Sequence, residues 1–488
     1  MDNMNNVSVN DSANGTMPQQ PMQQNQQGEQ GQSAPQMQQG QQIPTIQQAP
    51  QGEQKKPVKP DKKFIAIIAG AVALVVVIVA AFLIVGAITS SKKDDDKTEL
   101  FSDGLVPVCV DGKWGYADKN GKVKIALVFD SVSTFNDGIA VAKHDGKWGY
   151  IDKKGKYLIQ PMFDDASAFS DGLAAVKTGF TWGYIDKKGK YVIMPQYDAA
   201  GTFNDGLAVV KMDGKYGYID KKGKQVIACQ YDNATLFDNS GFARITVDGK
   251  TGFINKKGKV TIAPIYKYAY MFGDNGYTVV YDDDYKYNLI DKKGKALFSV
   301  QYDRISNECV CNMWLVRIDY KYGYVNKKGE MVIAPVFDRA ADFSETDKLA
   351  AVRVDGKYGY VDTKGVMKIP AQFDSASTFV NGYAVVEIDG KYGIINKKGQ
   401  YAVAPAYDDI ITTASNNSGI VAYEIDGKAG YMTVKGKTIT SAMYDGISEF
   451  SDDGYAIVKV DGKYGIINKK GKYVITPSYD KIIGLSVE

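Results

Sequence analysis

The chain contains few of the side chains that most often carry out catalysis. Its 488 residues include a single histidine, His144, so a Ser-His-Asp or Cys-His arrangement could use only this residue. The sequence also lacks HExxH, GxSxG and GxxxxGK[ST] motifs. His144 precedes an Asp-Gly turn, at a position that other segments fill with Met212, Val247 or Val354. We therefore expect an exposed residue beside a turn, and no enzyme activity.

Cysteines are also scarce. The four that are present, Cys109, Cys229, Cys309 and Cys311, are too few and too irregularly spaced for a disulfide framework. Cys309 and Cys311 form a C-x-C with no second pair at zinc-site spacing. We interpret them as two substituted loop positions, with a disulfide or thiol switch to Cys229 or Cys109 as the alternative. No metal site and no cofactor is predicted.

The chain lacks a strong excess of charge of either sign. Lysine and arginine number 59 against 56 acidic residues, which gives a formal net charge of +3. This balance excludes the strong positive field on which nonspecific nucleic-acid binding depends, so we expect no nucleic-acid partner. The acidic run from Asp282 to Lys286, DDDYK, lacks the DxDxDG spacing of a calcium loop. A solvated loop is the favoured interpretation.

Residues 1–63 are poor in aromatic and β-branched side chains, and residues 1–60 hold 17 glutamines. Such a segment cannot bury enough apolar surface to offset the entropy lost on ordering. We therefore predict a disordered, glutamine-rich tail, either a solvated spacer or a docking tail for a partner.

A long hydrophobic run follows from Phe64 to Ile88, with 25 residues free of charge. As a helix it would extend about 37 Å, enough to cross a hydrocarbon core of about 30 Å. Residues 64–88 thus predict a transmembrane helix in contact with the lipid bilayer. Five lysines precede this run within nine residues and three follow it, which places the N-terminus in the cytoplasm and the remainder outside the cell. Residues 89–98 form a charged linker.

From residue 99 to residue 488 the sequence is periodic, with eleven copies of a unit of 34 to 37 residues. A unit such as Leu207 to Phe237 contains short β-branched and aromatic runs separated by turn residues, which indicates three strands. Eight copies join the first two strands by Asp-Gly, which suits a type I′ turn. Asp/Asn-Lys-Lys-Gly-Lys then predicts a type I turn followed by a left-handed glycine.

Ten of the eleven copies also carry a glycine in mid-strand, preceded by an aromatic residue in most of them, and the remaining copy has Asn288 in its place. Strand side chains alternate, so Trp148 and Tyr150 are expected on one face, with Gly149 and Ile151 on the other. A glycine there indicates close backbone approach, which we assign to a neighbouring unit. The candidate structural or ligand-contact positions are Trp114, Gly115, Trp148, Gly149, Trp182, Gly183, Tyr216, Gly217, Tyr322, Gly323, Tyr358, Gly359, Tyr392, Gly393, Tyr464 and Gly465.

The third strand runs into Pro-x-Tyr/Phe-Asp, as in Pro195 to Asp198. Proline cannot donate to a central ladder, so it should end the strand or lie at an edge. The succession K-W/Y-G-Y/I, D/N-K-K-G-K and P-x-Y/F-D resembles the WG repeat family of bacterial surface and envelope-associated proteins. The resemblance extends from Glu99 to Lys481 and implies tandem β-hairpin modules without catalytic residues. Thr251 and Ala429 depart from it in lacking the aromatic residue.

The predicted fold is an all-β tandem array preceded by the transmembrane helix and the tail. An open solenoid or superhelix is favoured, because eleven units exceed the about four to eight blades of typical propellers and because the unit length suits three strands. Two adjacent propellers are the alternative.

The predicted function is a membrane-tethered, noncatalytic binding module outside the cell, for a cell-wall polymer or a protein partner. Repeated shallow contacts can give high avidity, although the aromatic residues could serve only to pack one repeat against the next. The alternative is a transmembrane sensor whose glutamine-rich tail contacts a cytosolic partner.

Overall fold

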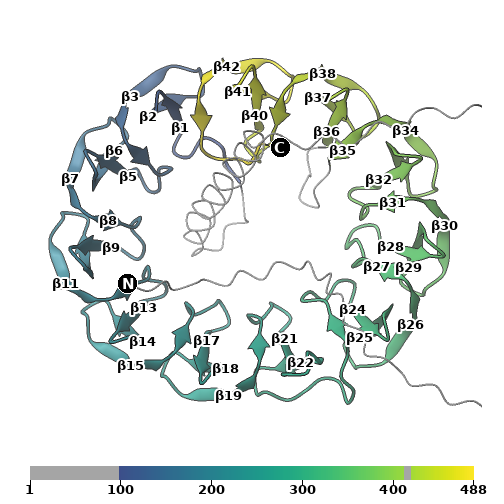
Figure 1. Ribbon diagram of the computed structural model, residues 1–488, viewed down its shortest axis with the longest axis horizontal. Helices are drawn as coiled ribbons and strands as arrows, with labels where there is room; N and C mark the ends of the chain where they lie inside the picture. Colours follow the sequence, from purple (N-terminus) through teal and green to yellow (C-terminus); the bar gives the residue numbers. More distant parts are fainter. Residues whose placement is uncertain (1–97, 412–418, 488) are drawn as a thin grey trace, which may run out of the picture. The chain divides into compact units, whose positions relative to one another are not determined.

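The computed structural model describes residues 98–411 and 419–487. The regular secondary structure in this part of the chain consists of β-strands. They form eleven small antiparallel sheets arranged in a propeller-like ring (Figure 1). No helix within these residues is long and apolar enough to span a membrane. The tail 1–63, the predicted transmembrane helix 64–88 and almost all of the linker 89–98 lie outside the described residues.

Ten sheets have four strands and the sixth has three. The first five sheets contain β1 (Leu105–Val110), β2 (Lys113–Asp118), β3 (Val123–Phe129) and β43 (Lys481–Ile482); β4 (Ser131–Val132), β5 (Ile139–His144), β6 (Lys147–Asp152) and β7 (Tyr157–Phe163); β8 (Asp165–Ala166), β9 (Leu173–Thr178), β10 (Thr181–Asp186) and β11 (Tyr191–Tyr197); β12 (Ala199–Ala200), β13 (Leu207–Met212), β14 (Lys215–Asp220) and β15 (Gln225–Tyr231); and β16 (Asn233–Ala234), β17 (Phe242–Val247), β18 (Lys250–Asn255) and β19 (Val260–Tyr266).

The remaining six sheets follow the same order along the chain. They contain β20 (Tyr268–Ala269), β21 (Tyr277–Tyr281) and β22 (Tyr287–Asp291); β23 (Arg304–Ile305), β24 (Met313–Ile318), β25 (Lys321–Asn326) and β26 (Met331–Phe337); β27 (Arg339–Ala340), β28 (Leu349–Val354), β29 (Lys357–Asp362) and β30 (Met367–Phe373); β31 (Ser375–Ala376), β32 (Tyr383–Ile388), β33 (Lys391–Asn396) and β34 (Tyr401–Tyr407); β35 (Asp409–Ile411), β36 (Ile420–Ile425), β37 (Lys428–Thr433) and β38 (Thr438–Tyr444); and β39 (Gly446–Ile447), β40 (Tyr455–Val460), β41 (Lys463–Asn468) and β42 (Tyr473–Tyr479).

Both turns of the sequence repeat have the expected conformation. In the second sheet, Asp145 and Gly146 have φ angles of 50° and 77°, as a type I′ turn requires. In the next turn Gly155 has a φ of 77° and donates its N–H to the Asp152 carbonyl at 2.9 Å. The Asp152 carboxylate accepts two further backbone N–H bonds within the turn, from Lys154 and Lys156, both at 2.9 Å. These local predictions are confirmed.

The prediction of three strands per unit is wrong, because a fourth, very short strand follows Pro-x-Tyr/Phe-Asp. After Asp164 the chain forms the two-residue strand β8, which pairs with β9 of the following hairpin. Every four-stranded sheet after the first is thus built from two successive sequence copies. A two-residue strand is too short to leave a hydrophobic pattern in the sequence.

The same arrangement closes the ring. No copy precedes the first hairpin, and its β1 instead pairs with β43, with Val108 opposite Ile482 and Cys109 opposite Lys481. One sheet therefore joins the two ends of the repeat region. Every other short strand pairs with the hairpin of the next copy, and the last short strand pairs with the hairpin of the first copy. The repeats therefore form one closed ring. The expectation of an open solenoid is wrong, and so is the alternative of two propellers.

The core lies between neighbouring sheets. Tyr150 is fully buried against the following sheet, in a cluster with Ala174, Val176 and Ile185. Ile151, one residue further along β6, is fully buried in the preceding cluster with Tyr116. The alternation predicted for these strands is confirmed, and both faces of each sheet contribute to the core.

The close approach at the first glycine comes from within the same sheet, and this corrects the expectation of a neighbouring unit. A Cβ atom at Gly149 would lie 2.6 Å from the Ile159 oxygen and 2.8 Å from the Pro161 nitrogen, both on the adjacent strand β7. The register between β6 and β7 shifts at this point, as in a β-bulge. The neighbouring unit approaches the second glycine instead, since a Cβ at Gly155 would lie 2.8 Å from Ile125 of the preceding sheet.

The sixth sheet shows what happens without this glycine. Asn288 takes its place, and the residues after β22 make only isolated bridges, Tyr287 to Tyr302 and Ile290 to Ala296. The Asn288 amide donates to the Phe298 carbonyl at 3.1 Å. The side chain thus bonds to the backbone of the segment that would form the third hairpin strand, and this segment is not a regular strand here.

The proline of Pro-x-Tyr/Phe-Asp lies on an edge strand, as predicted. Pro161 belongs to β7, and the sheet order leaves β7 paired on one side only. In Figure 1 this strand and its equivalents form the outer rim of the ring. Because proline has no N–H to offer, it makes the rim a poor template for pairing with another chain.

Replacing the first glycine should destabilise the ring. In Gly149→Ala the new methyl group would overlap the backbone of β7, so we expect a loss of about 1–3 kcal/mol in the free energy of unfolding, measured by chemical denaturation. Gly146→Asn is the matched control, because that turn glycine has open space around it and asparagine tolerates positive φ. Equal stability of the two variants would contradict the assigned contact.

Candidate functional site

The candidate aromatic residues all lie at the same point of their sheets, at the start of the second hairpin strand. All eight are half-buried, and the glycines that follow them are buried. Trp148 illustrates the geometry, with Lys143 opposite on β5 and Phe163 opposite on β7. The Lys143 ammonium lies 5.6 Å from the centroid of the indole ring.

The same pairing of cation and ring recurs around the molecule. It joins Lys211 to Tyr216 at 5.3 Å, Lys459 to Tyr464 at 5.4 Å, Arg353 to Tyr358 at 5.9 Å and Arg317 to Tyr322 at 6.0 Å. Each distance is within the range of a cation–π contact. Trp148 also packs against the inter-sheet cluster that contains Tyr150. The aromatic side chains are therefore partly accessible to solvent, and five of the eight lie beside a cation.

An aspartate that the sequence analysis did not single out links most sheets to the next. The Asp130 carboxylate accepts a hydrogen bond from the Lys113 ammonium at 2.7 Å and from the Gly146 N–H of the following sheet at 3.0 Å. The hydrogen bond from Lys113 holds the pKa of this carboxyl below its usual value. We call the equivalent residues the linking aspartates: Asp130, Asp164, Asp198, Asp232, Asp303, Asp374, Asp408, Asp445 and Asp480.

The linking aspartate of the last copy makes the same bond across the closure. Asp480 pairs with Lys463 and accepts the Asp111 N–H at 2.7 Å. The signal was present in the sequence as the final residue of Pro-x-Tyr/Phe-Asp, 17 residues after the lysine that it binds. The backbone N–H that this aspartate accepts from the next copy could be identified only once the arrangement of the sheets was known.

A buried tyrosine provides a second link. The Tyr150 hydroxyl donates to the Ser167 carbonyl of the next loop at 2.8 Å, and burial raises the pKa of this phenol well above its ordinary value. Equivalent bonds join Tyr116 to Ser133, Tyr184 to Gly201, Tyr218 to Thr235, Tyr324 to Ala341, Tyr360 to Ser377 and Tyr431 to Ser448.

The two kinds of turn lie at opposite ends of the ring. The strands within each sheet are antiparallel, so the Asp-Gly turns share one end and the Lys-Lys-Gly turns share the other. Each Lys-Lys-Gly turn carries one to three lysines. A few of these lysines contact acidic residues of neighbouring loops, as Lys153 does with Asp103 at 3.5 Å and Lys221 with Asp171 at 3.7 Å. Others, such as Lys154, are exposed and make no ion pair. We call this end the lysine end.

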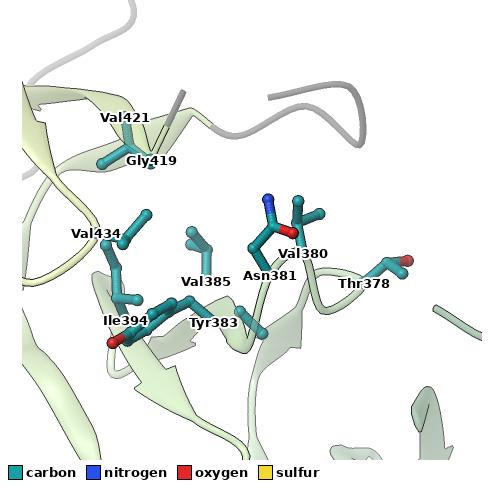
Figure 2. A pocket seen from close by; sticks show the side chains of 10 residues that line it. Thr378, Val380, Asn381, Tyr383, Val385, Ile394, Gly419, Val421 and Val434 are labelled. Atoms are coloured by element: carbon teal, nitrogen blue, oxygen red, sulfur yellow. The ribbon is translucent and has the colours of Figure 1, made fainter. Parts of the chain in front are cut away.

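An apolar pocket of about 70 Å³ lies between the ninth and tenth sheets (Figure 2). Its walls include Val385 and Ile394 from one sheet and Val421 and Val434 from the other. Ile394 stands at the position that Tyr150 holds in the second sheet. The pocket is far below the roughly 300–1,000 Å³ of typical ligand sites, so we regard it as a packing gap.

The other residues considered in the sequence take structural positions. His144 is half-buried, in contrast to the exposed position expected, and its Nδ1 lies 2.6 Å from the Tyr157 hydroxyl. The four cysteines are free thiols. In the acidic run, Asp282 caps its own turn and Asp283 pairs with Lys250. Within the described residues, no group of three or more His, Cys, Asp or Glu side chains could hold a metal ion.

Comparison with known proteins gives a clear match at the level of the repeat. The family model of the WG containing repeat matches residues 96–114, 114–148, 148–179, 182–216, 216–250, 252–287, 322–358, 358–392, 392–428, 430–464 and 464–486. The unmatched residues 288–321 contain the copy with Asn288. A search of curated proteins found no match.

Solved structures give only distant likenesses. A eukaryotic initiation factor is 13% identical, with coverage of 78% of this chain and 96% of that chain and a TM-score of 0.40. BamB from Moraxella catarrhalis is 13% identical over 62% of this chain and 97% of that chain, with a TM-score of 0.29. Hsv2p from Kluyveromyces lactis is 11% identical over 51% and 89%, with a TM-score of 0.27. These scores are too low to support any assignment.

The linking aspartates should make stability depend on acid pH. The hydrogen bond from Lys463 lowers the pKa of the Asp480 carboxyl in the folded protein, and the pKa of Asp130 is lowered in the same way by Lys113. Their contribution is therefore complete above the unfolded-state value of about 3.9 and is lost as pH falls through the lower folded-state pKa. Asp480→Asn should be less stable than wild type at pH 7, and this difference should shrink below about pH 4. Thermal melts between pH 2 and 7 measure it.

The control for this series is Asp213→Asn, because Asp213 lies in an exposed Asp-Gly turn. Asparagine suits a type I′ turn, so this variant should follow the wild-type pH profile. A pH-independent difference between wild type and Asp480→Asn would show that the carboxylate charge makes no contribution to ring closure.

Proposed function

Because the chain belongs to the WG containing repeat family, we propose that it is a noncatalytic binding module held at the cell membrane by residues 64–88, with its ring outside the cell. Its partner in this proposal is an anionic polymer of the cell envelope, bound by the lysine end. The β-rich repeat ring supports the binding role, and the hydrophobic run with its flanking lysines supports the location.

The observation that carries the proposal is the repetition of one lysine-bearing turn around one end of the ring. The polar side chain that opens the turn is already engaged by the backbone of that turn, as Asp152 is. The exposed lysines that follow are thus held on rigid turns at regular intervals. Many weak, equivalent contacts of this kind bind strongly to a partner that repeats its own charge.

The location has a direct test. We expect protease added to intact, wall-stripped cells to remove a C-terminal tag and to leave an N-terminal tag protected, since the lysine distribution places the tail inside. Immunoblots of both tags measure this, with lysed cells as the control in which both are lost. Protection of the C-terminal tag alone would place the ring in the cytosol and overturn the proposal.

Binding through the lysine end predicts a graded loss. The variant Lys154→Gln, Lys188→Gln, Lys222→Gln and Lys257→Gln removes four exposed cations from four successive turns. We expect its half-maximal binding to isolated cell walls to be roughly tenfold weaker, because several contacts of a few tenths of a kcal/mol act together. The binding should also weaken with added salt.

The matched control replaces four lysines at the other end of the ring: Lys143, Lys177, Lys211 and Lys459, each to glutamine. It removes the same charge and should leave wall binding unchanged. Walls stripped of their anionic polymers should not bind the wild-type protein. Equal losses in both variants would show that net charge, and not the lysine end, determines binding.

A further inference from the structure

The fifth copy departs from the repeat at four positions that lie together in space. Three are on the hairpin of β17 and β18, and one follows β19. Arg244 stands where the preceding copy has Val209, Thr246 where it has Lys211, Thr251 where it has Tyr216 and Lys267 where it has Asp232. Lys267 thus replaces a linking aspartate by a residue of opposite charge, and Thr251 replaces the half-buried aromatic residue.

These replacements open a pocket of about 230 Å³ at the junction of the fifth and sixth sheets. Arg244, Thr246, Thr251 and Lys267 all line it, together with Asn233. Two of its lining side chains are cationic and none is acidic. The threonines are much smaller than the aromatic ring and the lysine that fill the equivalent space in the fourth copy. The departures therefore create both a space and a positive potential within it.

The Arg244 guanidinium is held in a fixed orientation. One of its nitrogens donates to the Ala269 carbonyl at 2.8 Å, and its central carbon lies 4.7 Å from the centroid of the Tyr268 ring. Stacking on the ring keeps the guanidinium plane in place. A cation fixed in this way loses little conformational entropy when it binds a ligand, and the remaining N–H groups are suited to the oxygens of an oxyanion.

Two acidic residues near the pocket, Asp232 and Asp283, are already paired with other groups. Asp232 pairs with Lys215 and accepts the Asp248 N–H at 2.7 Å. Asp283 pairs with Lys250, the lysine that would otherwise bind a linking aspartate at position 267. Lys267 itself is exposed. Together with the hydrogen bond from Lys250, its positive charge lowers the pKa of the Asp283 carboxyl.

We propose that this pocket binds a phosphate-class oxyanion, either free phosphate or the phosphate group of an ester. Arg244 provides an oriented guanidinium group, and Lys267 provides the second positive charge. The hydroxyls of Thr246 and Thr251 and the amide of Asn233 provide neutral hydrogen-bonding groups. Two cations that line one pocket suit a tetrahedral anion, and the nearby Asp283 carboxylate is already paired with Lys250. The site is separate from the lysine end and occurs at one junction of the ring.

Isothermal titration of the full-length protein in detergent tests the proposal, with inorganic phosphate and glycerol 1-phosphate as probes at constant ionic strength. We expect saturable binding at one site per chain. Lys267→Asp restores the linking aspartate and should weaken binding at least tenfold, as should Arg244→Met. Tighter binding of inorganic phosphate would identify the free ion as the ligand, and tighter binding of the ester would identify a phosphate ester; either supports the site.

The matched control is Lys211→Met, which removes a cation at the equivalent junction of the fourth copy and should leave binding unchanged. Lys267 is exposed, so Lys267→Met tests the site even if Arg244→Met fails to fold. Absence of saturable binding with both probes, or wild-type affinity in Lys267→Met and Lys267→Asp, would overturn the proposal. The proposed wall binding is independent of this result, because the lysine-end variant retains Arg244 and Lys267.

Discussion

The contact between the mid-strand glycine and the backbone of the outer strand determines the form of every complete sheet. At Gly149 there is no room for a Cβ atom, because Ile159 and Pro161 approach the α-carbon directly. That approach permits the bulge in β7, and the bulge lets the outer strand carry a proline at the rim. Where Asn288 replaces the glycine, the outer strand is lost from the sheet. The signature of the repeat is therefore a packing requirement within a sheet as much as a surface feature.

The sequence was sufficient for the elements whose structure depends on neighbouring residues. The Asp-Gly and Lys-Lys-Gly turns, the alternation of Tyr150 and Ile151, and the edge position of Pro161 all follow from local backbone preferences and strand geometry. The ring did not follow, because it depends on a two-residue strand, Lys481–Ile482, and on its pairing with β1. No hydrophobic period extends over two residues, and no local rule brings the first and last copies together.

The candidate site shows the same division. Trp148 and its equivalents were found because the sequence repeats them, but the contact of the Trp148 ring with a cation was recognised only from its cross-strand partner Lys143. The departures at Thr251 and Lys267 are visible in the sequence as breaks in the pattern. Their common meaning is visible only in the structure, where Arg244 and Tyr268 are found beside them. Residues that depart from the repeat pattern can thus be interpreted together once the contacts between copies are known.

The pairing of β1 with β43, which closes the ring, also constrains the order in which the ring can form. Each four-stranded sheet after the first can be completed as soon as two successive copies have been synthesised, because its four strands are close in sequence. The first sheet requires residues separated by almost the whole repeat region, and the bond from Asp111 to Asp480 joins positions 369 residues apart. Loop closure over such a distance is slow, so β1 keeps an open edge throughout synthesis, and this edge is the part of the ring most exposed to pairing with another nascent chain.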